Sequence, residues 1–582
     1  MTTDFAIIML GLCLVIAGFG RYLPRLGFSR NAGAVTLLIT SMIAFASLSM
    51  AVGFSLILPA SSESTSFLSV FFDGWWLRDR VSILSLFGLA GGIVTIACAH
   101  SIEVGRSQFP KRSEVGSLTL LWALASISVM TDHVVLQWAL FSAACWLSVW
   151  QCTRMSGFFS NRAWKQVLIL LGLADILAMT GLQGMSFIWA IGSFSDLQAV
   201  TELVSQDAFQ RAVLAVSAIW LGLSFLIRLG GFPFLIWNGL ARGSLSSSLV
   251  VLMFPALLTV SQIFRWHLIL AIDSSSRTML GGLLVLFALV HAAASIFQAE
   301  AQRAFRVSLA LVSLVAAGTL FEVTASPISL LFAVACLMLP TAILVFPVPP
   351  DVRRLAAAAI LLSGIFGSCH AVEQLITVAS DPATGTPIIL PVLFAVAYAL
   401  CAASLFAGIL SPKMDQHERQ PSKSEICLSA VIWLVLSNLL INTLISPERS
   451  VGSGLGTTVW LAAVAGILGI VWNCRQNLAF SESLTESTLV KLLNNDFNVA
   501  KLLERAAFEP LQQVSTHFQS NLSHLLLAIP GRIFNGLCDD VRLVDESRHQ
   551  ASTEEDTSSR NGLFTTFLLA IIVMIAAIWA AA

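Results

Sequence analysis

Charged residues are scarce in this 582-residue sequence: they make up 11% of it, whereas hydrophobic residues make up 57%. An ordinary soluble protein carries about 25% charged and about 45–50% apolar residues. A chain of this length with so little charge lacks the polar surface that water-soluble domains need, which excludes a soluble globular protein. The sequence therefore predicts an all-α, polytopic helix bundle whose main solvent is the lipid bilayer.

Other absences exclude several functional classes. The formal net charge is −1, so the surplus of Lys and Arg typical of a nucleic-acid-binding protein is missing. The ten cysteines are scattered singly, with no CxxC pair and no Cys/His cluster at metal-ligand spacing, so we expect neither a disulfide framework nor a metal site. No GxGxxG fingerprint opens a βα unit. We therefore expect no cofactor, no catalytic redox residues and no nucleic-acid partner.

Long apolar runs are abundant instead. A membrane-spanning helix needs about 20 mostly apolar residues, because each residue rises ~1.5 Å against a hydrocarbon core of ~30 Å. About sixteen runs meet this requirement. The candidate spans are 5–20, 33–59, 81–101, 115–131, 134–153, 164–192, 209–230, 245–272, 278–298, 305–325, 327–348, 354–378, 386–411, 425–446, 455–474 and 563–582. The first has no basic flank and no cleavage site, so we interpret it as a retained helix.

Lys and Arg are concentrated in alternate loops, which predicts the orientation. The basic loops contain Arg21, Arg25 and Arg30; Arg106, Lys111 and Arg112; Arg154, Arg162 and Lys165; Arg242; Arg303 and Arg306; Arg353 and Arg354; and Lys413, Arg419 and Lys423. The intervening loops have few cations, and the loop at 193–208 has only acidic residues. Basic loops stay in the cytoplasm, so we expect a cell inner-membrane protein with both termini on the non-cytoplasmic side.

The long polar interruption at 475–562 divides the chain. Apolar residues recur at three- and four-residue spacing between 489 and 511, which predicts an amphipathic lateral helix within 475–544. The Ser-, Thr- and Glu-containing segment 545–562 is typical of a polar linker. We thus expect a transmembrane bundle over 1–474, the lateral helix, the linker, and a C-terminal span at 563–582.

Ionisable residues inside the spans are candidates for a proton path, because each costs at least ~2.5–3.5 kcal/mol to insert. The candidates are Asp175, Arg228, His291, Glu300 and Arg303. Each of them can instead pack against a partner or extend to the membrane surface.

Four further ionisable residues have more ordinary interpretations. Arg265 and His267 lie near a span end, so we expect their side chains to extend to the membrane surface. His370 and Glu373, spaced i,i+3, are expected to pair with each other on one helix face.

A helix break follows Arg228. Gly230, Gly231 and Pro233 come directly after it, and Pro255 interrupts the next span. Such breaks are tolerated at membrane depth where protein or a water-filled cavity satisfies the freed backbone groups, and they are typical of ion paths. A kinked bundle helix is the alternative interpretation.

Three stretches resemble the antiporter-like subunits of respiratory complex I and of Mrp-type antiporters. The first runs from Arg228 to Pro255, where Arg228 stands at the position of the family's membrane lysine. The second is Phe72-Asp-Gly74, and the third is Phe297-Gln-Ala-Glu-Ala-Gln-Arg-Ala-Phe-Arg-Val-Ser308. The layout, with a lateral helix before the last span, resembles the L or fifth-subunit type.

The chain departs from this family at several titratable positions. The glutamate of the family's Trp-Glu pair is Ala139 here, and Gln302 replaces a lysine, although Asp175 matches the family's aspartate in the sixth span. The segment 331–341 and the span after Pro387 have no ionisable residue. A guanidinium keeps its proton where an ammonium readily releases it, so Arg228 is a poor substitute for a titrating lysine.

The resemblance implies a divergent antiporter-like subunit of a complex-I-like (L-type) or Mrp A-type assembly, in which proton translocation is partly lost. Other membrane subunits would be its partners. One alternative is the membrane subunit of a two-component inorganic-carbon pump, which would add a soluble cytoplasmic partner. Another is a scaffold that conducts nothing.

Overall fold

The computed structural model describes a large part of the chain, all of it within the first of two units, Met1–Phe497 and Asn498–Ala582. The described residues are 2–20, 22–26, 32–57, 79–103, 112–156, 161–188, 192–194, 207–230, 237, 245–296, 300–321, 327–345, 352, 355–357, 359–360, 389–410 and 423–445. These ranges contain helices and no β-strand. A single isolated bridge pairs His133 with Ser193.

The helices follow one another along the chain with short connections. They are α1 (Thr2–Gly20), η1 (Leu23–Leu26), α2 (Ala32–Ile57), α4 (Arg80–Glu103), α5 (Arg112–Met130), α6 (Val134–Ser156), α7 (Asn161–Ile188), α9 (Ala208–Leu229), α11 (Leu245–Val251), η2 (Leu252–Ala256), α12 (Leu257–Arg265), α13 (His267–Leu270), α14 (Ser274–Ile296), α15 (Glu300–Phe321), α16 (Pro327–Leu344), α18 (Ile389–Leu410) and α19 (Lys423–Ile445). Eight helices within the described ranges are long and apolar enough to cross a membrane. The predicted all-α membrane bundle is confirmed.

Most predicted spans coincide with described helices. This holds for every span from 5–20 to 327–348, and for those at 386–411 and 425–446. The spans at 455–474 and 563–582 lie outside the described residues, as does most of the span at 354–378. The lateral helix of 475–544 and the linker of 545–562 also lie outside them.

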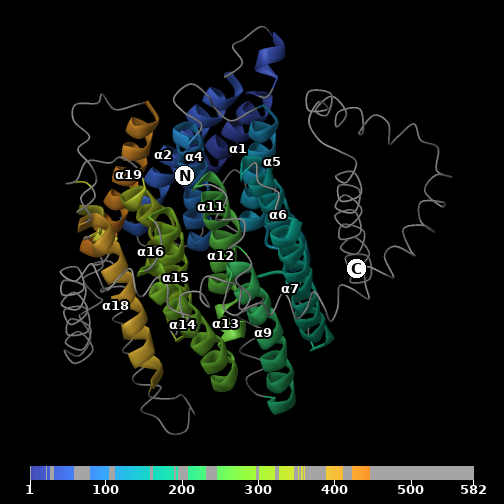
Figure 1. Ribbon diagram of the computed structural model, residues 1–582. Coiled ribbons are helices and arrows are strands. Elements are labelled where there is room, and N and C mark those ends of the chain that lie inside the picture. The colour runs from blue at the N-terminus through green and yellow to red at the C-terminus, as the bar shows by residue number, and fades with distance from the viewer. Residues whose placement is uncertain are drawn as a thin grey trace, which may run out of the picture. The chain divides into compact units, whose positions relative to one another are not determined.

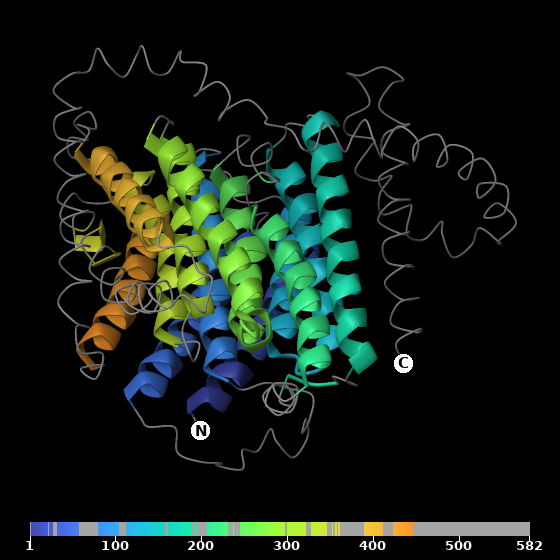
Figure 2. The same ribbon diagram turned by 90° about the horizontal axis from the view of Figure 1, so that it is seen from below.

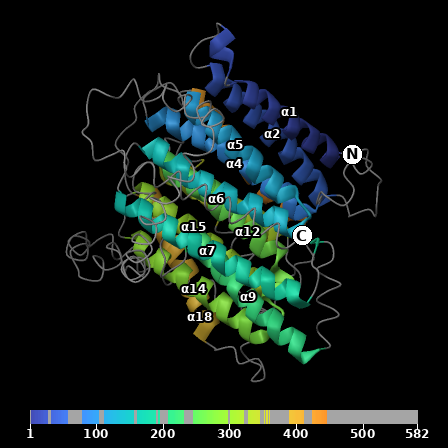
Figure 3. The ribbon, with the colours of Figure 1, turned by 90° about the vertical axis from the view of Figure 1, so that its right-hand side faces the viewer.

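The described helices run side by side (Figure 1), with α7 and α9 at one edge of the bundle and α18 and α19 at the opposite edge. The view from below shows the same order (Figure 2). In the middle, α4 packs against α2, α5, α11, α16 and α19. The span formed by α11, η2 and α12 is buried over its whole length, whereas α7 is buried over 33% of its span. Figure 3 faces the side on which α6 and α7 lie.

Pro255 interrupts its span as a widened turn. Residues Leu252–Ala256 form a π-helical turn in which the backbone N–H of Leu257 donates to the carbonyl of Leu252. Because proline has no N–H to donate, a local departure from α-helical bonding accommodates it. The helix continues on both sides of this turn, so Pro255 does not end the span.

Glycines on α4 allow its close contact with this span. A methyl group at Gly88 would lie 2.8 Å from Leu257, and one at Gly92 would lie 2.7 Å from the Cβ of Met253. Buried hydroxyl groups add a polar contact between the same helices, since Ser85 Oγ and Ser261 Oγ are 2.6 Å apart. In an apolar bundle, small residues and interhelical hydrogen bonds are what bring helices together.

Candidate functional site

Arg228 lies in the last turn of α9, and the local sequence explains why the helix stops there. Gly230 follows with φ = 84°, a left-handed conformation that glycine adopts without strain. Trp237 lies across this end: its indole N–H donates to the carbonyl of Arg228 at 2.6 Å. A Cβ at Gly230 would meet the Trp237 ring at 2.7 Å. The break therefore fixes the backbone that carries Arg228.

The side chain of Arg228 forms an ion pair with Asp175 on α7. Arg228 is fully buried, and its Nη2 contacts Asp175 Oδ1. Its Nη1 donates to Ser224 one turn earlier on α9 and to the carbonyl of Ala174 at 3.5 Å. A buried charge is tolerated where an opposite charge and hydrogen bonds compensate the lost hydration, and this arrangement supplies both.

Helix α6 completes the site with four side chains. Ser142 Oγ donates to Asp175 Oδ1 at 2.6 Å, and Trp146 Nε1 donates to Asp175 Oδ2 at 2.9 Å. The guanidinium of Arg228 lies 4.5 Å from the centre of the Trp138 ring and 5.0 Å from that of Phe141. Cation–π contacts of this kind are strongest where water is excluded.

The sequence contained a signal for the α6 residues that our sequence analysis did not use. Trp138, Ser142 and Trp146 recur at four-residue spacing, which places them on one face of a helix. The same analysis noted Ala139 as the lost family glutamate, and Ala139 is buried in α6. The structure provides the acidic partner of Arg228 from α7 instead of α6.

His291 lies near the same break, on α14. Its side chain is 1% exposed, and neither ring nitrogen has a hydrogen-bond partner. The imidazole packs edge-on against Phe287 at 4.4 Å. The backbone of Gly230 and the guanidinium of Arg306 are its polar neighbours. Gly230 therefore lies between the ion pair and a second buried ionisable group.

The other two proton-path candidates are on α15. Glu300 is the first residue of this helix, and Arg303 follows three residues later. Arg303 is half-buried, and its Nη2 lies 3.5 Å from the carbonyl of Ile296 at the end of α14. The structure brings neither residue into contact with the Arg228–Asp175 pair. Among the break residues, Gly231 and Pro233 lie outside the described residues.

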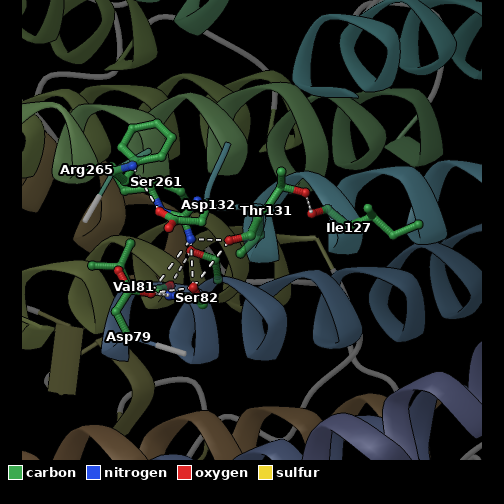
Figure 4. A network of polar contacts seen from close by, with 11 residues as sticks. Asp79, Val81, Ser82, Ile127, Thr131, Asp132, Ser261 and Arg265 are labelled. Atoms are coloured by element: carbon green, nitrogen blue, oxygen red, sulfur yellow. Dashed lines mark hydrogen bonds and ion pairs between the residues drawn. The ribbon is translucent and has the colours of Figure 1, made fainter. Parts of the chain in front are cut away.

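A second polar network surrounds Arg265 at the end of α12 (Figure 4). Its Nη2 donates to Ser82 Oγ at 2.7 Å and to the carbonyl of Val129, and it lies 3.7 Å from Asp79 Oδ1. Asp132 is a further acidic neighbour. This network, which we call the Arg265 network, joins the adjoining ends of α4, α5 and α12.

The expectation that Arg265 and His267 extend to the membrane surface is wrong. The Arg265 side chain is 3% exposed, and His267 is buried. The free carbonyl at the end of α5 and the side chains at the start of α4 satisfy the guanidinium inside the protein, so it has no need to reach water. His370 and Glu373 lie outside the described residues.

No described group suggests a metal centre. Within the ranges that the structure covers, no three His, Cys, Asp or Glu side chains are grouped so that they could hold a metal ion. His100 at the end of α4 lies 3.5 Å from Glu114 at the start of α5. This contact is a two-residue link between neighbouring helices.

Comparison with known proteins gives a structural match without a sequence match. The sequence matches no protein-family model and no curated protein. Its fold is similar to a chain in the structure of the Mrp complex from Dietzia sp. DQ12-45-1b, with a TM-score of 0.65 and 13% identity. The match covers 94% of this chain and 63% of that chain. At this identity the likeness shows a shared fold.

The chain is therefore a multi-pass membrane protein with the helix-bundle fold of a subunit in an Mrp complex. This agrees at a coarse level with the resemblance seen in the sequence. The Arg228–Asp175 pair is the part of that bundle in which buried charges of opposite sign meet across two helices.

Proposed function

We propose that this protein is an antiporter-type membrane subunit of a multi-subunit, cation/proton-coupled assembly. The observation that carries the proposal is the Arg228–Asp175 pair, buried beside the end of α9 at Gly230. Ionisable groups inside membrane bundles are costly and are characteristic of ion and proton paths. The shared fold with a chain of an Mrp complex supports the same class of function.

The chemistry of the pair limits what it can do. Arg228 remains protonated, so it provides a fixed positive charge and not a proton carrier. Asp175 is the member of the pair that can exchange a proton, and His291 is the next buried group that can do so. We propose that Arg228 holds Asp175 in place for an ion path with fewer titrating groups than the family's lysine-based path.

The finer assignment rests on the sequence. The predicted sixteen-span layout with a lateral helix favours the L-type subunit of a complex-I-like enzyme. In that case the NADH and quinone reactions belong to other subunits, because this chain has no redox motif. The Ala139 substitution is what favours the inorganic-carbon pump as the alternative; co-purification of a soluble zinc protein with this chain would support it.

The test is proton flux in inverted membrane vesicles, with and without a sodium gradient. We expect Arg228→Ala combined with Asp175→Asn to abolish coupled flux while the assembly stays intact. The double variant removes both charges, which avoids the ~3–5 kcal/mol penalty of leaving one buried charge unpaired. Arg228→Lys restores the family's titrating residue and is expected to retain flux. Unchanged flux in the double variant would favour the scaffold and contradict the proposal.

A further inference from the structure

Asp175 has an unusual position for a membrane carboxylate. It lies at the middle of α7, about 20 Å from either end of the helix at ~1.5 Å per residue. Although Arg228 is fully buried, the Asp175 side chain is 25% exposed. A carboxylate open to lipid at this depth is costly, so something other than hydrocarbon must cover this face.

Other residues on the same side of α7 also differ from a lipid-facing surface. Gly172, Asp175, Ile176, Thr180 and Gln183 follow one another at three- and four-residue spacing and form one face, which we call the α7 face. Ile176 is 65% exposed, and Thr180 and Gln183 are also exposed. Of the eight described spanning helices, α7 has the smallest buried share.

The outer face of α1 provides the contrast. Its exposed residues are large and apolar, with Phe5, Leu12 and Phe19 each more than half exposed. Such a surface is suited to lipid chains. The α7 face instead combines a glycine, a carboxylate and an amide, the composition that brings membrane helices together.

We propose that the α7 face binds a membrane-spanning helix of a partner subunit, and that this helix donates a hydrogen bond to Asp175 from a neutral side chain. A carboxylate has about four acceptor sites, and Asp175 accepts from Ser142, Trp146 and Arg228. One site is left for a further donor. Arg228 already balances the charge, so a hydroxyl or amide donor fits better than a second cation.

Gly172 defines how closely the partner approaches. No other atom lies within 4 Å of the position that a Cβ would occupy on Gly172. A helix with a small residue opposite this glycine can therefore pack closely on α7. The chain's own segment 563–582 is a poor candidate for this place, because between Phe567 and Ala582 its sequence contains no hydroxyl or amide side chain.

The first test compares two glycine variants of the full chain, purified with its assembly in mild detergent. Gly172→Leu fills the space that the partner helix occupies, whereas Gly11→Leu on α1 fills an equally open space that faces lipid. We expect Gly172→Leu to lower the yield of co-purified membrane subunits at least about tenfold, which is ~1.4 kcal/mol of association free energy. Gly11→Leu should leave that yield unchanged. Equal yields for the two variants would overturn the proposal.

The second test identifies the occupant. A photo-reactive phenylalanine analogue in place of Ile176 is expected to cross-link to a membrane-spanning segment of one co-purified subunit that has a Ser, Thr, Asn or Gln at the contact. Cross-links to lipid, or to residues 563–582 of the same chain, would overturn the proposal.

The inference rests on the proposed function only in assuming an assembly, and the two fail separately. Lost flux in the Arg228/Asp175 double variant with a normal yield for Gly172→Leu would refute the α7 face alone. Partner loss in Gly172→Leu with unchanged flux in the double variant would refute the ion path alone.

Discussion

Asp273 caps α14 where the chain re-enters the bundle. Its Oδ2 accepts hydrogen bonds from the hydroxyl and from the backbone N–H of Ser275, the latter at 3.0 Å. The Ser275 hydroxyl, followed by the backbone N–H groups of residues 274–276, lowers the pKa of Asp273. Such a carboxyl stabilises the fold above its unfolded pKa of ~3.9 and loses this effect as the pH falls through the folded value.

Asp273→Ala is therefore expected to lower the free energy of unfolding by about 1 kcal/mol near neutral pH. The difference from the wild type should shrink below about pH 4, where the wild-type carboxyl also loses its charge. Asp273→Asn keeps a capping acceptor and serves as the control. Unfolding measured in detergent at two pH values checks this, and an Ala penalty that is as large in acid as at neutral pH would contradict it.

Sequence reasoning found the charged residues of the site but not their pairing. Asp175 and Arg228 stood out because each interrupts an apolar span, and that signal is local. Their contact depends on how α7 and α9 are rotated against each other, which a separation of 53 residues in the chain does not encode. The orphaned carbonyl of Val129, which helps to hold Arg265, has no sequence signature at all.

At the scale of helices, close packing between α4 and η2 depends on Gly92. A methyl group there would lie 2.7 Å from the Cβ of Met253, and a Cβ moves only if the backbone moves. We expect Gly92→Ala to lower the free energy of unfolding by about 1–3 kcal/mol, the usual cost of overpacking.

Gly11→Ala on α1 is the matched control, because no other atom lies within 4 Å of its added methyl group. Unfolding of both variants in mixed detergent micelles measures the difference. If the two substitutions changed stability equally, the close contact between α4 and η2 would not limit packing.

The helix boundaries followed from apolar run length, but the internal form of one span did not. The run at 245–272 predicts one helix interrupted at Pro255, and the structure shows a π turn followed by a short separate helix, α13. Proline signals that regular bonding fails, yet it does not determine whether the helix bends, ends or widens. Packing against α4 and α6 decides that.

At the scale of the whole molecule, the alternation of basic loops predicts which helix ends face the cytoplasm. The connection that contains Ser275 should face outward, whereas the start of α5 at Arg112 should face the cytoplasm. A membrane-impermeant maleimide is expected to label Ser275→Cys in intact cells, and Arg112→Cys only after permeabilisation.

Background labelling in this experiment is limited by burial. Cys13, Cys98, Cys145, Cys152, Cys336 and Cys401 are buried. Cysteines outside the described helices should be replaced before labelling. The reverse labelling pattern would place both termini in the cytoplasm and would contradict the orientation.

The Arg228–Asp175 pair also bears on how transport responds to voltage. A charge that crosses the whole membrane field gains or loses ~2.3 kcal/mol per 100 mV. The two opposite charges are in direct contact, so together they present no net charge on which the field can act. Any voltage dependence of transport must therefore arise from the ion that moves and not from displacement of this pair.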